Sequence, residues 1–135
     1  MSFVIRCLDC EHETSYHPLT INCPKCNGEW REAIYDYENI AKVYKEGLAN
    51  RPLDLWRYWD LLPIHQPNRD IRMGEGGTPL IRALNLGMML GCPNIFIKDE
   101  RQGPTSSFKD RQAAVTIAAL KEAGITEWWQ PRPGM

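Results

Sequence analysis

The 135-residue sequence predicts an α/β protein, in which a small cysteine-bearing β unit precedes the opening of an α/β domain. Four cysteines stand in two close pairs among turn-forming residues within the first 35 positions, which is typical of short strands and tight turns. Further along, a strand-like apolar run precedes a long alanine-rich helical pattern. Charged residues make up 24% and hydrophobic residues 43%, a balance typical of globular domains rather than disordered chains.

The charge balance argues against two classes of partner. Sixteen basic residues against 17 acidic ones give a net charge of −1, so no summed field attracts nucleic acid or an anionic membrane. No apolar run approaches the ~20 residues that a membrane span needs. The first residues lack a charged segment followed by an apolar stretch, so no secretory signal is expected. We expect a cytoplasmic protein.

Residues 1–35 are predicted to form a zinc-ribbon-like unit. Twelve residues separate two Cys-x2-Cys pairs, which comprise Cys7, Cys10, Cys23 and Cys26. In a reducing compartment such pairs indicate metal ligands or redox groups before disulfides. Four thiolates complete a tetrahedron around zinc and leave no open position, so the predicted site is structural. His12 and His17 lie between the pairs and could serve as ligands, but four cysteines already fill the coordination sphere. The alternative is that the two cysteine turns hold no metal or are redox-active.

Residues 36–73 are predicted to form a helical linker. In its first part, apolar residues recur at helical spacing until residues 50–52 stop the pattern: Ile40, Val43 or Tyr44, and Leu48. An aromatic stretch over 53–62 predicts a second, short helix that buries three side chains in a core: Trp56, Trp59 and Leu62.

Residues 74–127 are predicted to open an α/β domain. A glycine-rich loop at 74–80 precedes a short helix at 84–90 and a strand of the buried type at 94–98. A helix of four to five turns is expected over 107–123.

The ends of this last helix carry recognisable signals. Thr105, Ser106 and Ser107 can each cap its N-terminus, and Ser107 with Asp110 has the spacing of a capping box. Its alanines suit close packing on a sheet, and Gly124 ends it.

Lys109 is the candidate catalytic residue. It opens the helix directly after a polar, glycine-containing loop, where the positive end of the helix dipole disfavours an ammonium group. A lysine that is easily neutral can form a Schiff base with a carbonyl cofactor. On these residues alone, an ordinary solvated lysine is the more common interpretation of this position.

Three segments together resemble the threonine synthase family. They are Gly74-Glu75-Gly76-Gly77-Thr78-Pro79-Leu80, Ile97-Lys98-Asp99-Glu100 and Gly103-Pro104-Thr105-Ser106-Ser107-Phe108-Lys109-Asp110-Arg111. Those enzymes depend on pyridoxal phosphate and have the tryptophan-synthase-β-like fold (fold type II). Some members carry an N-terminal zinc ribbon followed by a stretch similar to Tyr35-Asp36-Tyr37. The resemblance covers residues 5 to about 127.

The resemblance implies a site and a reaction. Lys109 matches the lysine that holds pyridoxal phosphate as a Schiff base and then moves protons at the substrate Cα; Phe108 and Asp110 match the flanking positions that shape the cofactor pocket. The family usually has glycine where Ser106 stands. The implied substrate is O-phosphohomoserine, which with water gives threonine and phosphate. The alternatives are a threonine dehydratase, a cysteate synthase, or a non-catalytic zinc-ribbon binding module.

The sequence departs from the family after the lysine helix. The family's Ser-Gly-Asn segment, its later glycine-rich phosphate loop and its pyridine-nitrogen partner are not found, so the domain is expected to be an incomplete start and this chain inactive alone. Where a Val-Val strand is expected after Glu127, the chain reads Trp128-Trp129 and continues to residue 135. A frameshifted or truncated reading frame is one hypothesis for this atypical tail; an unusual natural tail is the other.

Overall fold

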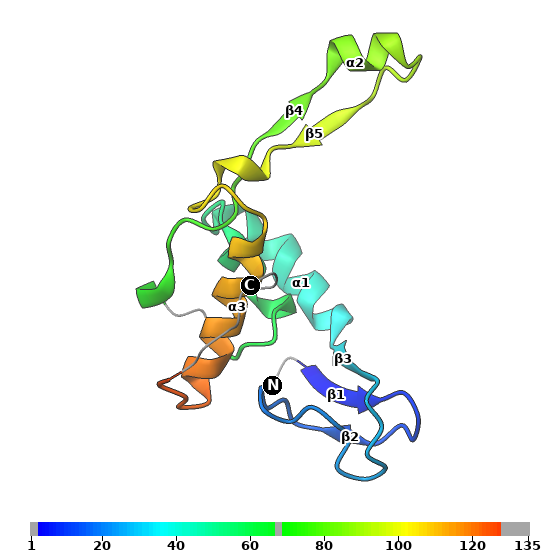
Figure 1. Ribbon diagram of the computed structural model, residues 1–135, viewed down its shortest axis with the longest axis vertical. Helices are drawn as coiled ribbons and strands as arrows, with labels where there is room; N and C mark the ends of the chain where they lie inside the picture. Colours follow the sequence, from blue (N-terminus) through cyan, green and yellow to red (C-terminus); the bar gives the residue numbers. More distant parts are fainter. Residues whose placement is uncertain (1–2, 67–68, 128–135) are drawn as a thin grey trace, which may run out of the picture.

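The computed structural model describes residues 3–66 and 69–127, in which helices and strands are mixed (Figure 1). This confirms the predicted α/β class in its coarse form. The atypical tail expected at 128–135 lies outside the described residues. Throughout the described part of the chain, every helix falls short of the length and apolar character that a membrane crossing requires.

The N-terminal unit is a three-stranded antiparallel sheet in the order β2-β1-β3. Strand β1 (Phe3–Cys7) pairs along its whole length with β3 (Arg31–Tyr35) and briefly with β2 (Glu13–Thr14). Alternate side chains of a strand point to one face. On β1 that face carries Phe3, Ile5 and Cys7, which are all buried. The strand therefore places its cysteine on the covered side of the sheet.

Helix α1 (Tyr37–Gly47) follows the sheet where the apolar periodicity predicts it. Asp36 begins the helix, and its carboxylate accepts the Asn39 N–H at 3.1 Å, as an N-cap does. A 3₁₀ turn η1 (Leu48–Asn50) ends this segment. A second helical stretch, η2 (Leu55–Leu61), is also 3₁₀ and kinks at Tyr58. The two predicted helices of this region are thus confirmed, the second in a tighter form.

The core lies between η2 and helix α3 (Lys109–Glu122). Its buried members are Leu55, Trp56, Ile64, Ala114, Ala118 and Ala119. Trp59 and Leu62 pack against this cluster, as predicted. The alanines were expected to pack on a sheet, and this expectation is wrong within the described residues. They meet the indole of Trp56 and the loop that follows η2 instead, because small side chains let either kind of neighbour approach closely.

Strands β4 (Leu80–Arg82) and β5 (Phe96–Lys98) form an antiparallel ribbon with the short helix α2 (Leu84–Met89) at its tip (Figure 1). The prediction of a buried strand here is wrong, because Phe96 is 52% and Ile97 49% exposed. The ribbon projects away from the body in Figure 1, and β5 pairs with β4 alone among the described strands. An apolar strand is buried only where another layer covers it.

The two ends of α3 differ, since only the C-terminus carries the predicted cap. At the C-terminus, Gly124 adopts a left-handed conformation with a φ of +73°. Its N–H donates to the Lys121 carbonyl, while the Ile125 N–H donates to the Leu120 carbonyl. This pair of bonds is a Schellman motif, so the predicted helix stop is confirmed. At the N-terminus the helix begins two residues later than expected, and its N-cap Phe108 has no side-chain capping bond.

Glu122 ties the end of α3 to the loop after η2. Its carboxylate accepts the backbone N–H groups of His65 and Gln66, each at 2.9 Å, and lies 3.2 Å from His65 Nδ1. Burial raises the pKa of Glu122, but the N–H groups of Gln66 and His65 lower it by more. The pKa of Glu122 therefore lies below its ordinary value of 4.5. A carboxylate with a lowered folded-state pKa stabilises the fold above its unfolded-state pKa.

We therefore expect Glu122→Gln to reduce the free energy of unfolding by about 1 kcal/mol near pH 7, because an uncharged amide accepts these hydrogen bonds less strongly. The difference from wild type should vanish as the pH falls through the folded-state pKa of Glu122. Urea unfolding followed by tryptophan fluorescence at several pH values measures this. Glu46→Gln, at an exposed position of α1, serves as the control. A pH-independent loss would contradict the assigned role.

Candidate functional site

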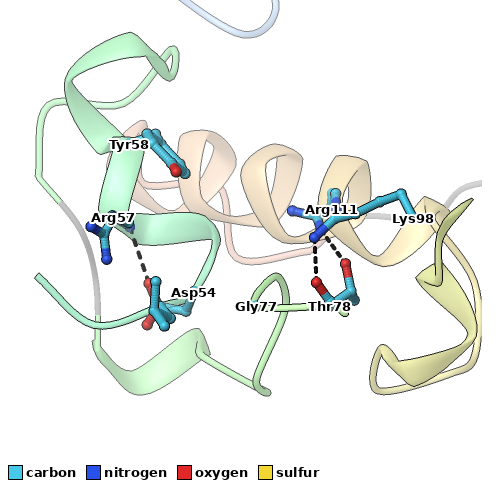
Figure 2. A pocket seen from close by; sticks show the side chains of 8 residues that line it. Asp54, Arg57, Tyr58, Gly77, Thr78, Lys98 and Arg111 are labelled. Carbon is cyan, nitrogen blue, oxygen red and sulfur yellow. Dashed lines mark hydrogen bonds between the residues drawn. The ribbon is translucent and has the colours of Figure 1, made fainter. Parts of the chain in front are cut away.

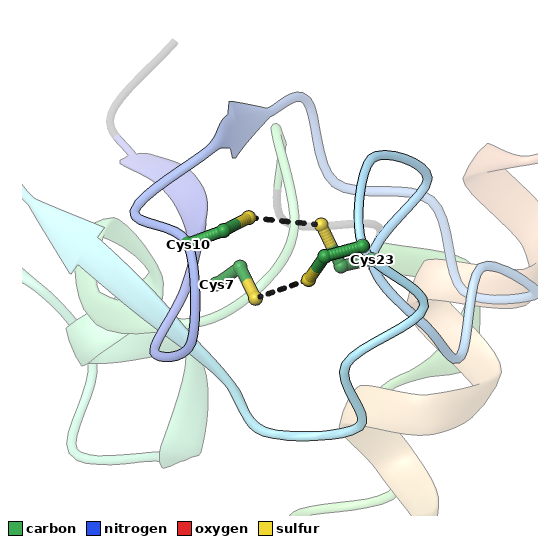
Figure 3. A group of neighbouring side chains, drawn as sticks. Cys7, Cys10 and Cys23 are labelled. Carbon is green, nitrogen blue, oxygen red and sulfur yellow. Dashed lines mark hydrogen bonds between the residues drawn. The ribbon is translucent and has the colours of Figure 1, made fainter.

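The four paired cysteines converge on one point between two turns of the N-terminal unit (Figure 3). The Sγ atoms of Cys7 and Cys26 lie 3.6 Å apart, those of Cys10 and Cys23 lie 3.7 Å apart, and all four lie within 4.8 Å of one another. A tetrahedral ion with metal–sulfur bonds of ~2.3 Å has sulfur–sulfur edges of about 3.8 Å. The cluster can therefore hold a metal ion.

The two cysteine turns are near copies of each other. In the first, Glu11 has a φ of +58° and its N–H donates to the Cys7 carbonyl at 3.0 Å. In the second, Asn27 has a φ of +61° and its N–H donates to the Cys23 carbonyl at 2.8 Å. Each left-handed residue directly follows the second cysteine of its pair. This turn folds the chain back so that both thiols of a pair face the other turn.

Two thiols of this cluster have pKa values shifted in opposite directions. The backbone N–H of Cys26 stabilises the thiolate of Cys23, whose pKa falls to about 7. The pKa of Cys26 rises to about 12: the Gly28 N–H lowers it, but the neighbouring thiols of Cys10 and Cys7 raise it by more. Four adjacent thiolates repel one another, so a nearby cation is the natural compensation for their charge.

A second constellation joins the three segments that the sequence singled out (Figure 2). Arg111 of α3 donates from Nε and from a terminal nitrogen to the Glu100 carboxylate at 2.8 and 2.9 Å. Thr78 of the glycine-rich loop donates to the same carboxylate at 2.6 Å and accepts from Arg111 at 3.2 Å. Lys98 donates to the Thr78 carbonyl. We call Thr78, Glu100 and Arg111 the clamp.

The clamp keeps its acid ionised. The Arg111 guanidinium, followed by the Thr78 hydroxyl, lowers the pKa of Glu100 to about 2. The neighbouring Asp99 is buried, and hydrogen bonds from Arg101 lower its pKa to about 2 as well. A cavity of about 350 Å³ lies between the clamp and η2 and is lined in part by Tyr58, Lys98 and Arg111. A bidentate arginine–carboxylate pair adds geometric specificity as well as energy.

Lys109 is the first residue of α3, two positions before Arg111 of the clamp, and its side chain is exposed. Its N–H donates to Ser107 Oγ at 3.3 Å. The predicted capping box does not form as expected: the Asp110 carboxylate accepts the N–H of Thr105 at 2.9 Å and also the Thr105 hydroxyl. Phe108, the other predicted cofactor residue, is 66% exposed. The structure therefore keeps the Lys109 amine accessible.

The clamp residues received no role from the sequence. Glu100 and Arg111 are 11 residues apart, and Thr78 is 33 residues from Arg111, so no local spacing pairs them. The signal that could have found them is weaker. Two of the three segments hold charged residues of opposite sign without an assigned role, Glu100 and Arg111.

Comparisons with known proteins show what this chain is similar to. Residues 71–132 match the family described as pyridoxal-phosphate dependent enzyme. The threonine synthase of Methanocaldococcus jannaschii is 38% identical over 89% of this chain and 29% of its own length. That of Methanosarcina acetivorans is 34% identical over 90% of this chain and 29% of its own length. A Bacillus threonine synthase is 40% identical over 52% of this chain and 20% of its own length.

The matched segment is thus related to the pyridoxal-phosphate-dependent enzymes. Within that class, the chain is similar to threonine synthases over about nine-tenths of its length, and the resemblance drawn from its three segments is confirmed. The chain spans about 29% of the length of the two archaeal relatives. No solved structure matches the chain.

Ser106 is a point of strain in the loop before Lys109. Its φ of +58° lies in the left-handed region, where a non-glycine residue costs roughly 1 kcal/mol or more. This is the position at which the family usually has glycine. We expect Ser106→Gly to raise the free energy of unfolding by about 0.5–1 kcal/mol, after allowance for glycine's greater freedom in the unfolded chain.

Thermal unfolding measures the effect of Ser106→Gly as a rise of a few degrees in Tm. Ser107→Gly is the matched control, since it removes the hydroxyl that accepts the Lys109 N–H and should lower Tm instead. Equal decreases for both variants would show that Ser106 is not strained.

Proposed function

We propose that this chain supplies the cofactor-lysine segment of a pyridoxal-phosphate-dependent threonine synthase, which converts O-phosphohomoserine and water to threonine and phosphate. The observation that carries the proposal is that the glycine-rich loop, the segment after β5 and the first turn of α3 meet at the clamp, and that the same turn carries an exposed Lys109. Similarity to threonine synthases over about nine-tenths of the chain supports it.

The residues present fit the lysine end of such a cofactor. The Lys109 amine is exposed at the start of a helix, and the aromatic ring of Phe108 beside it is open to contact. In the proposed reaction Lys109 Nζ would hold the cofactor until the substrate amine displaces it, and the freed amine would then take and return the proton at the substrate Cα. Asp110 supports the turn through Thr105. When bound, pyridoxal phosphate supplies the electron sink for the carbanion at Cα.

The proposal includes a division of the chain into parts. Residues 1–35 form a zinc-ribbon-like unit, residues 36–73 a helical linker, and residues 74–127 the piece of a fold-type-II pyridoxal-phosphate domain that carries Lys109. In the first part, Cys7, Cys10, Cys23 and Cys26 bind one structural zinc ion. The sulfur spacing and the paired turns support this assignment, because zinc prefers four thiolates in a closed tetrahedron.

We expect the purified protein to contain one zinc ion per chain. Cys7→Ser and Cys23→Ser, one from each turn, should abolish binding because a closed site loses a quarter of its ligands. Elemental analysis and thermal unfolding, with and without a chelator, measure this. Cys92→Ser changes an exposed cysteine outside the cluster and should retain the metal. A metal-free protein whose Tm is unaffected by chelator or by Cys7→Ser would contradict the proposal.

The catalytic proposal can be tested in a chimera. The chain replaces the 121 aligned residues of the Methanocaldococcus jannaschii threonine synthase. We expect the chimera to release threonine and phosphate from O-phosphohomoserine, and Lys109→Ala to lower kcat at least ~10²-fold. Borohydride reduction in the presence of pyridoxal phosphate, followed by peptide mapping, should place the cofactor on Lys109.

Lys121→Ala, an exposed lysine on the same helix, is the control for this experiment. Its turnover and its cofactor label should match those of the unsubstituted chimera. A folded but inactive chimera, or a label that persists in Lys109→Ala, would count against the assignment.

A further inference from the structure

The two residues that follow Lys109 are both anchored to other parts of the chain. Asp110 holds the preceding loop through Thr105, and Arg111 holds Glu100 and Thr78. Successive residues of an α-helix are roughly 100° apart around its axis, so the anchors lie roughly 100° and 200° from Lys109. Two anchors at different angles fix a helical turn against rotation. Lys109 is left on the side that neither anchor occupies.

We propose that Arg111 is a positioning residue: its contacts with Glu100 and Thr78 set the direction in which Lys109 projects from the first turn of α3. The importance of that direction rests on the proposed function, since Lys109 must meet the cofactor at a defined angle. The contacts themselves belong to this chain.

Apolar packing cannot position this turn. The first buried residue of α3 is Ala114, more than one turn beyond Lys109. Phe108, the N-cap, contributes no side-chain hydrogen bond and is exposed. Ser106, just before it, has a left-handed φ. The first turn is therefore ordered by polar contacts, of which those of Arg111 reach farthest along the chain.

The chemistry of the contact requires arginine. A guanidinium presents two parallel N–H groups to a carboxylate, whereas a lysine ammonium is a point charge that rotates freely about such a contact. Glu100 sits in the short 3₁₀ turn η4 (Glu100–Gln102), which Asp99 caps through the Arg101 N–H at 3.3 Å. The acceptor is thus held on its own element, and the clamp fixes the first turn of α3 against η4.

Hydrogen exchange on the full chain tests the clamp without reference to catalysis. Arg111→Met should speed exchange of the amides of residues 109–112 by about tenfold or more, and Arg111→Lys should only partly restore protection. Glu122→Gln, at the other end of α3, is the control: it should speed exchange near residues 119–122 and leave 109–112 unchanged. Unchanged exchange at 109–112 in Arg111→Met overturns the proposal.

The chimera allows kcat and KM to be measured separately, and a merely structural role of Arg111 would not lower kcat selectively. Arg111→Met should lower kcat by about tenfold or more while KM for O-phosphohomoserine stays within about twofold, because the substrate still binds but meets a misdirected amine. The charge-swapped pair Glu100→Arg with Arg111→Glu should recover part of the lost kcat. A loss of Tm with unchanged kcat overturns the positioning role. An inactive parent chimera would overturn the proposed function while the exchange result still decides the clamp.

Discussion

The packing of Trp56 against the alanine face of α3 is the interaction on which the rest of the structure depends. Trp56 is 2% exposed and contacts a cluster that includes Ala114 and Ala118. Its indole Nε1 is buried without a hydrogen-bond partner among the described residues, which costs about 1–3 kcal/mol. Burying so large an aromatic surface outweighs that loss. From this core α3 is joined to the loop after η2 through Glu122 and to Glu100, just beyond the ribbon, through Arg111.

The sequence predicts well those features that are decided within a few residues. The helix after Asp36 follows from apolar spacing and a capping carboxylate, and the helix stop at Gly124 follows from the left-handed conformation that glycine adopts easily. The convergence of Cys7, Cys10, Cys23 and Cys26 is also largely local. Each pair forms its own tight turn, so only the contact between the two turns depends on residues that are far apart in the sequence.

The features that the sequence does not predict depend on distant neighbours. Phe96 and Ile97 are as apolar as a buried strand, yet their exposure is decided by what covers the ribbon and not by their own pattern. Likewise, Asp110 has the spacing of a capping box with Ser107, but its carboxylate accepts hydrogen bonds chiefly from Thr105. The clamp joins residues 11 and 33 positions apart, a pairing that no periodicity encodes.

The two candidate sites have opposite requirements, because a structural metal ion must be enclosed whereas a reactive amine must stay exposed. A structural metal site gains from closure, and the cysteine turns accordingly place four sulfurs around one point, two of them on buried residues. A reactive amine must instead stay open, so the turn that carries Lys109 cannot be fixed by burying it. Charged contacts on the far side of the helix resolve this conflict. Arg111 lies roughly 200° around the axis from Lys109, so the clamp can hold the turn while the amine remains free to reach a ligand.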